Sequence, residues 1–188
     1  MFDAHCHFRT GDCIFRTGEL LPQNISKDYD VGLVRSSEIG LDRRFSSVLS
    51  MDRQVEILKE ILQYAENNGI AVTLHCVRET GLMLEILGKM NFEPLTVMWH
   101  GFTGSAETAA RLHGLGVIIS LGLKMSDRVA ELYRANPYIV LETDYEGCDF
   151  NEYTRELEAH YERCAAALKM SVNELEKRCR ELTNAFKS

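Results

Sequence analysis

Four histidines and two acidic residues of this 188-residue chain stand where they could hold metal ions. They are His5, His7, Glu38, His75, His100 and Asp144. Imidazole together with carboxylate suits zinc, manganese or iron better than calcium. Six such groups exceed the three protein ligands that one catalytic zinc usually takes. They suit two ions about 3.5–4 Å apart, bridged by a carboxylate and a hydroxide, which is a site for metal-assisted hydrolysis.

The first two histidines are separated by a single residue. A strand alternates its faces, so residues i and i+2 point the same way. His5 and His7 can therefore reach one ion, while Cys6 points to the other side. Each candidate ligand taken alone has an ordinary alternative as a core histidine, a surface carboxylate or a helix cap. The metal interpretation rests on all of them occurring together.

The elements that must position these groups alternate between strand and helix from Met51 onward, which indicates an α/β fold with parallel strands. Apolar runs predict six clear strands at residues 1–6, 31–38, 70–74, 95–99, 116–120 and 138–142. Periodicity and caps predict helices at 52–67, 81–90, 105–113 and 126–135, and a further helix after the capping box of Ser171 and Glu174. Every predicted strand except 116–120 ends in a candidate ligand, and active sites of parallel α/β folds lie at that end.

Composition places the chain among ordinary globular domains. With 45% hydrophobic residues, 26% charged residues and a formal charge of -7, residues 1–188 are expected to form a single domain. No run approaches eighteen apolar residues and no secretory leader is visible, so we expect a cytoplasmic protein without membrane contact. The six cysteines are then reduced thiols. His113 and His160 fall on predicted helices and are expected at the surface.

Longer motifs carry a family resemblance. They are Phe2-Asp-Ala-His-Cys-His7, Ser37-Glu-Ile-Gly-Leu-Asp42, Leu74-His-Cys-Val-Arg78, Trp99-His-Gly-Phe-Thr-Gly-Ser105, Leu141-Glu-Thr-Asp144 and Thr183-Asn-Ala-Phe186. In these segments the chain resembles the TatD-related metal-dependent hydrolases, within the wider amidohydrolase-like barrels. The resemblance runs from residue 1 to the end of the chain.

The resemblance implies a TIM-type (β/α) barrel with a binuclear site for two divalent cations such as zinc, magnesium or manganese. One ion would take His5, His7, Glu38 and Asp144, and the other would take Glu38, His75 and His100, with Glu38 bridging. It also implies phosphodiester hydrolysis, chiefly a DNase activity that can run 3′ to 5′. Asp144 would accept the proton of the attacking water and could pass it to the leaving oxygen.

Other polar residues near these motifs have two interpretations each. Arg78 could bind a substrate phosphate or be a surface arginine at a helix start, and Arg43 and Arg44 could meet a phosphate backbone or be solvated. Asp42 is a candidate to orient a ligand. Glu142 has the strand parity of Asp144 and should also point inward.

The chain departs from the family in length. His7 and Glu38 are 38 − 7 = 31 residues apart, where the family has two further βα units. Residues 11–29 look mostly like loop, with a short strand at 13–16. Six strands cannot close a barrel of eight, so either this segment supplies a seventh or the shortened barrel is open. An open edge must be covered, which makes a homo-oligomer an expectation.

Two rival functions remain at this point. A related hydrolase could cleave an amide, lactone or cyclic imide, although such enzymes often bridge their ions with a carboxylated lysine, and no strand end here offers one. The chain could also be a non-catalytic member that keeps the metals for stability. A closed tetrahedral site would be more usual in that case.

Overall fold

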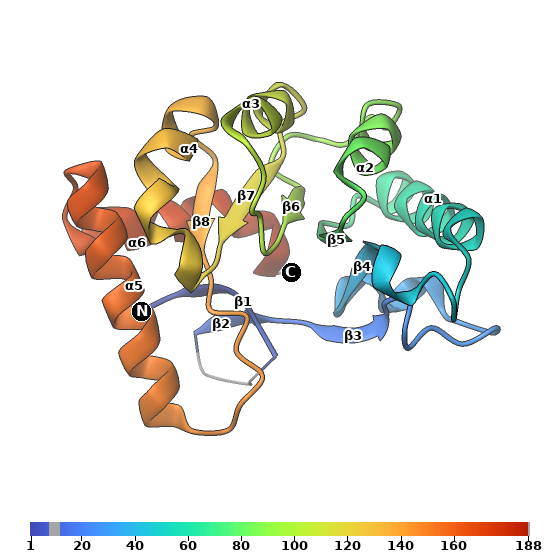
Figure 1. Cartoon of the computed structure of the whole chain (residues 1–188), viewed down its shortest axis with the longest axis horizontal. Coiled ribbons are helices and arrows are strands. Elements are labelled where there is room, and N and C mark those ends of the chain that lie inside the picture. Colours follow the sequence, from blue (N-terminus) through green and yellow to red (C-terminus); the bar gives the residue numbers. More distant parts are fainter. Residues whose placement is uncertain (8–11, 188) are drawn as a thin grey trace.

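The computed structural model describes residues 1–7 and 12–187 and shows an α/β fold built on parallel strands (Figure 1). The strands in the described residues are β1 (Asp3–Cys6), β2 (Cys13–Phe15), β3 (Thr17–Leu20), β4 (Ser37–Asp42), β5 (Val72–Val77), β6 (Val97–Trp99), β7 (Ile118–Leu121) and β8 (Ile139–Leu141). The α-helices there are α1 (Met51–Asn68), α2 (Thr80–Leu87), α3 (Ala106–Gly114), α4 (Val129–Ala135), α5 (Phe150–Leu168) and α6 (Val172–Leu182). Short 3₁₀ helices cover Val31–Arg35, Arg43–Phe45, Leu123–Arg128 and Asn184–Lys187.

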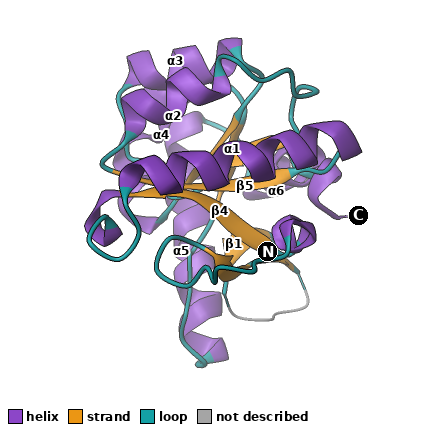
Figure 2. Cartoon of the chain, turned by 90° about the vertical axis from the view of Figure 1, so that its right-hand side faces the viewer, coloured by secondary structure: helices purple, strands orange, loops and turns teal. Residues whose placement is uncertain are grey.

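Strands β3 to β8 form one parallel sheet in chain order, and β1 pairs in parallel with β2. Helices α1 to α4 follow the outer side of the arc of strands β5 to β8, and β1, β2 and β3 lie along the opposite side (Figure 1). Helix α1 packs on β4, as the side view shows (Figure 2). Apolar residues of the strands and of the inner helix faces form one core, which fixes the strand ends relative to each other.

Residues 13–20 act as one strand that changes its partner at Arg16. Its first part pairs with β1 and its second part pairs with β4. At the exchange, Arg16 N donates to Cys6 O (3.2 Å) and Thr17 N donates to Ser36 O (2.8 Å). This segment therefore supplies the seventh strand, which was one of the two alternatives drawn from the sequence.

The remaining junction joins β1 to the segment that follows β8. Asp144 N donates to His5 O (3.1 Å), and His7 N donates to Tyr145 O (3.0 Å). Backbone hydrogen bonds thus connect seven strands in a ring, counting residues 13–20 once. The strand ladders of the described residues themselves form a two-stranded and a six-stranded sheet and do not close a barrel.

Local signals explain where several helices begin and end. Ser50 caps α1, and Gly69 ends it in the left-handed conformation at φ 62°. Ser105 caps α3, and Ser171 and Glu174 form the predicted capping box of α6. Among the described residues, no helix combines the length and apolar character needed to cross a bilayer.

Three expectations about elements were wrong. The predicted strand at 31–38 is a 3₁₀ helix followed by β4, because the Asp30 side chain accepts from Gly32 N and caps a helical turn. Ser126 lies inside a 3₁₀ helix rather than capping α4. The segment expected mostly as loop at 11–29, with a short strand at 13–16, contains β2 as expected but also a second strand, β3, while Gly11 lies outside the described residues.

Candidate metal centre

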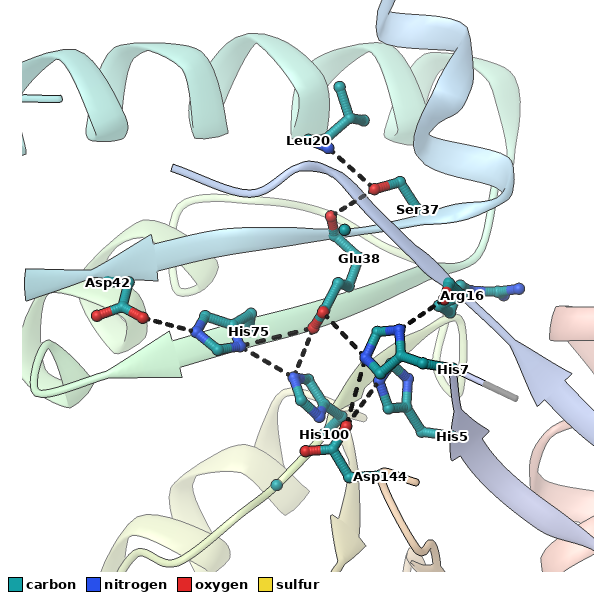
Figure 3. Close-up of polar contacts among 12 residues, drawn as sticks. His5, His7, Arg16, Leu20, Ser37, Glu38, Asp42, His75, His100 and Asp144 are labelled. Carbon is teal, nitrogen blue, oxygen red and sulfur yellow. Dashed lines mark hydrogen bonds and ion pairs between the residues drawn. The ribbon is translucent and has the colours of Figure 1, made fainter. Parts of the chain in front are cut away.

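Glu38 lies at the middle of the predicted ligand set, with its two carboxylate oxygens facing different partners (Figure 3). Oε1 lies 3.5 Å from His7 Nε2. Oε2 lies 2.6 Å from His100 Nε2 and 3.5 Å from His75 Nδ1. The sequence placed Glu38 at the end of its strand, but it is the second residue of β4, which continues to Asp42. The carboxylate is therefore buried below the rim of the ring.

Asp144 lies with the first two histidines. Its Oδ1 is 3.5 Å from His5 Nε2 and 3.4 Å from His7 Nε2. Its side chain is 45% exposed, whereas His5 is fully buried. Asp144 also has φ 54°, a left-handed backbone that a non-glycine residue adopts at a cost of roughly 1–3 kcal/mol. One oxygen of this carboxylate is thus close to two imidazoles while the group stays open to solvent.

The structure brings all six predicted ligands together. Ligand atoms of His5, His7 and Asp144 lie within 4.8 Å of one another, as do those of His5, Glu38 and His100. His75 joins the second group, because its Nδ1 lies 3.1 Å from His100 Nε2. The side chains come from β1, β4 and β5 and from positions just after β1, β6 and β8.

Two of the four imidazoles have a hydrogen-bond partner on the nitrogen that faces away from Glu38, and a third has a carboxylate near that nitrogen. His7 Nδ1 lies 2.8 Å from Arg16 O, and His75 Nε2 lies 3.1 Å from Asp42 Oδ2. His100 Nδ1 approaches Glu142 Oε1 at 3.8 Å. A carbonyl or carboxylate in this position fixes the tautomer and the orientation of a metal-binding imidazole. The geometry presents Nε2 of His7, Nδ1 of His75 and Nε2 of His100 to the centre.

Two of these outer partners are themselves held in place. Asp42 accepts from Arg44 Nε (2.9 Å) and from Arg44 N (2.9 Å). Glu142 Oε1 accepts from Gly101 N (2.6 Å), at the turn directly after His100. Asp42 and Glu142 therefore take the inward, supporting positions that the sequence suggested for them.

The donor set fits divalent metal ions. Several buried polar atoms at the centre make no hydrogen bond of good geometry, namely both ring nitrogens of His5, His100 Nδ1, and Glu38 Oε2, which His100 Nε2 meets only as an ion pair. Buried polar groups normally find partners, so a cluster of unsatisfied ones calls for an explanation. Bound cations would satisfy His5 Nε2 and Glu38 Oε2.

The electrostatics of the centre favour ionised carboxylates. Burial alone would raise the pKa of Glu38, but the contacts with His100 and His75 hold it far below its usual range. Burial also acts on Asp42, yet Arg44 and His75 lower the pKa of that carboxyl. Burial lowers the pKa of His5 well below its usual value, which keeps that imidazole neutral. A carboxylate and a neutral imidazole are the forms that bind metal.

Arg78, the predicted substrate-binding residue, directly follows β5 and is exposed. Its backbone lies in the left-handed region at φ 62°, as does that of Asp144. Strained non-glycine residues cluster at functional sites. Arg43 contacts the buried carboxylate of Glu79 instead of standing free.

Sequence reasoning missed two supports of the site. Asp3 accepts from Thr143 Oγ1 (2.6 Å), from Thr143 N (3.1 Å) and from His5 N (3.1 Å), which ties β1 to the segment before Asp144. Its shared strand parity with His5 and His7 was the available signal. Arg16 was the second, and nothing in its local sequence marks it.

The expectation of a surface position was wrong for His160, whereas His113 is partly exposed. His160 is fully buried, and its Nε2 donates to Leu121 O (2.8 Å) while Nδ1 lies 2.9 Å from Ser126 Oγ. His113 is half-buried against the ring of Tyr138. Cys76, Cys148, Cys164 and Cys179 are free thiols.

Known proteins resemble this chain in sequence and in fold. Residues 27–187 match the family model described as TatD related DNase. The chain is 35% identical over 120 residues to the "uncharacterized metal-dependent hydrolase YjjV" of Escherichia coli K12, a match that covers 60% of this chain and 45% of that protein. The chain thus spans under half the length of this curated relative.

Two solved structures share the fold. The crystal structure of the TatD homologue YjjV from Escherichia coli K12 superposes with a TM-score of 0.72 at 20% identity, covering 93% of this chain and 75% of that chain. A TatD family hydrolase from Entamoeba histolytica gives 0.63 at 12% identity, covering 93% and 74%. These matches confirm the expected fold class, a shortened TIM-type α/β barrel.

Proposed function

Since this chain belongs to the family of TatD-related DNases, we propose that it is a metal-dependent hydrolase that cleaves phosphodiester bonds of DNA in the cytoplasm. The observation that carries the proposal is the position of Glu38. Its two oxygens face different imidazoles, with His7 on one side and with His75 and His100 on the other. A carboxylate placed in this way can bridge two cations.

The proposed ion sites follow the two sides of Glu38. His5, His7, Glu38 and Asp144 would hold one ion, and Glu38, His75 and His100 would hold the other. Divalent ions at these positions would supply Lewis-acid chemistry that activates water at neutral pH and offsets charge on the phosphoryl oxygens. Zinc, magnesium and manganese are the candidates.

The side chains of the rim then have separate tasks. Asp144 is the proposed proton acceptor, because its carboxylate lies at the centre yet stays 45% exposed to an incoming water and substrate. Arg78 is the proposed phosphate-binding residue, because its guanidinium is exposed just beyond the strand that carries His75.

The direct test is elemental analysis of protein purified without chelator, followed by a nuclease assay. A DNA oligonucleotide labelled at either end is incubated with added magnesium, manganese or zinc. We expect two ions per chain and metal-dependent cleavage. Turnover of a dihydropyrimidine or lactone panel without DNA cleavage would instead identify an amide or lactone hydrolase. Two ions without hydrolysis of any phosphoester would indicate a non-catalytic protein.

Glu38→Ala should lose both ions and nearly all activity, because both proposed ion sites share this carboxylate. His113→Ala is the control, since this ring lies on α3 against Tyr138. Its metal content should match that of the unmodified protein. Full metal content and activity in Glu38→Ala would disprove the bridging assignment.

A further inference from the structure

The strand formed by residues 13–20 exchanges its partner at a single residue. Before Arg16 the strand pairs with β1, and after it the strand pairs with β4. Arg16 N still bonds to Cys6 O of β1, whereas Thr17 N already bonds to Ser36 O next to β4. The ladder is irregular on both sides of this point. A carbonyl at such an exchange is available to a side chain.

The carbonyl of Arg16 accepts from the ring of His7. His7 Nδ1 lies 2.8 Å from Arg16 O (Figure 3). An Nδ1–H that donates to a carbonyl leaves Nε2 without a proton in the neutral ring. That Nε2 is the atom that faces Glu38 Oε1 and Asp144 Oδ1. The backbone of Arg16 thus selects the nitrogen that His7 presents to the centre.

The side chain of Arg16 holds this backbone from inside the ring. Arg16 Nε donates to Thr73 Oγ1 (3.2 Å), and Nη1 donates back to Phe15 O (3.1 Å). Thr73 pairs with Glu38 in the β4–β5 register and lies two residues before His75. The guanidinium therefore connects the strand beside His7 with the strand that carries His75, past the intervening β4.

Burial of the charged Arg16 side chain costs free energy. Arg16 is only 6% exposed, and burial lowers its pKa to about 10, so that it keeps its charge at neutral pH. Its hydrogen bonds go to a hydroxyl and a carbonyl. A buried charge costs free energy unless it is paired or hydrogen-bonded. The two hydrogen bonds are therefore what the guanidinium contributes at this position.

We propose that Arg16 is a positioning residue of the metal centre, whose carbonyl fixes the ring of His7 and whose guanidinium holds that carbonyl through Thr73 and Phe15. The proposal rests on the proposed function only in that His7 binds an ion. It assigns a role to the segment between His7 and Glu38, where this chain is short.

The first test reads the ring itself in metal-free protein. Nitrogen-15 NMR of histidine-labelled protein, at a pH where the ring is neutral, reports which nitrogen of His7 carries the proton, and a His7→Asn variant assigns the signal. We expect the Nδ1–H tautomer in the unmodified protein and a mixture of tautomers in Arg16→Met. Arg35→Met is the matched control. Arg35 is exposed and lines the same small pocket as Arg16, beside Ile70 and Ala71.

The second test is a calorimetric titration with zinc or manganese. We expect Arg16→Met to weaken one of the two binding steps about 10–100-fold, the usual loss when an outer partner of a ligand is removed. The other step and the melting temperature of the metal-free protein should stay close to those of Arg35→Met. Arg16→Lys, which can keep one of the two anchors, should lie between the two.

The proposal would be overturned if Arg16→Met showed the same His7 tautomer and the same two metal-binding steps as the Arg35→Met control. Should Arg16→Met not fold, Thr73→Val decides, because it removes only the hydroxyl acceptor. We expect the same shift to a mixture of His7 tautomers in Thr73→Val. An unchanged tautomer there would refute the positioning role of Arg16. If the protein binds two ions but does not cleave DNA, only the proposed function is contradicted. The NMR and calorimetric measurements do not depend on turnover, so they still test the role of Arg16.

Discussion

Each imidazole of the centre has two nitrogens, and for His7 and His75 the residue behind the ring decides which one faces inward. Asp42 does this for His75, at 3.1 Å from Nε2, and leaves Nδ1 toward Glu38. Arg44 in turn binds Asp42 with its side chain. The affinity of the centre for metal therefore depends on residues that touch no ion.

Asp42→Ala should weaken metal binding about 10–100-fold, because His75 loses the acceptor that fixes its tautomer. Asp42→Asn keeps an acceptor oxygen and should recover part of the loss. Calorimetric titration with zinc measures both. Asp30→Ala is the matched control, since Asp30 accepts from Gly32 N at the start of a 3₁₀ helix just as Asp42 accepts from Arg44 N. Equal affinities in Asp42→Ala and Asp30→Ala would contradict the assignment.

At the scale of elements, the spacing between β4 and β5 sets the distance from Glu38 to His75. Gly40 lies opposite His75 in the register. A Cβ at Gly40 would lie 1.7 Å from His75 O, so any side chain there forces the two strands apart. The glycine is required by this close approach.

Gly40→Ala should therefore abolish folding or destabilise the protein by more than about 4 kcal/mol, an exceptional value for one methyl group. Gly81→Ala is the control, because nothing lies within 4 Å of its Cβ position in α2. It should be neutral or stabilise by about 0.4–1 kcal/mol. Urea denaturation of Gly40→Ala and Gly81→Ala measures the difference. Similar denaturation midpoints would show that β4 and β5 can move apart at little cost.

His160 joins α5 to the end of β7 through Leu121 O, and burial lowers its pKa. Below pH 6.5 the unfolded chain binds a proton that the folded ring does not yet accept. The free energy of unfolding therefore falls as the pH drops from about 6.5 toward the lower folded pKa. Urea denaturation at pH 7.5 and 5.5 should show that the free energy of unfolding falls less in His160→Gln than in the unmodified protein. Arg163 and Cys164 lie beside this ring and are unchanged in the comparison. An equal fall of the unfolding free energy in both proteins would show that His160 does not cause it.

The strands after residue 69 could be predicted from the sequence because each is a short apolar run between turns. The candidate ligands followed from their predicted positions at strand ends, although Glu38 is the second residue of β4. The first fifty residues resisted prediction, because Val31, Leu33 and Val34 look like a strand while Asp30 caps a helical turn. The burial of His160 depends on a carbonyl 39 residues away, which no local pattern encodes.

At the scale of the whole molecule, the centre draws on β1, β4, β5, β6 and β8 and exists only when all of them are assembled. Ions that bind the folded chain stabilise it by mass action, by about 2.7 kcal/mol at a metal concentration of 100 times Kd. Removing metal with a chelator should therefore lower the melting temperature, and adding zinc or manganese back should restore it. Calorimetry of Glu38→Ala gives the control, where the chelator should have no effect. A melting temperature indifferent to metal in the unmodified protein would count against ion binding.

The junction between β1 and the segment after β8 also bears on the order of events during translation. Asp3 and Thr143, which are 140 residues apart, bond to each other beside His5 and Asp144. At a ribosomal speed of about 5–20 residues per second, the first histidines leave the exit tunnel roughly 7–28 s before Asp144 does. A nascent polypeptide cannot assemble the full candidate ligand set in that interval. A cation that needs the whole set can be bound only after Asp144 has emerged.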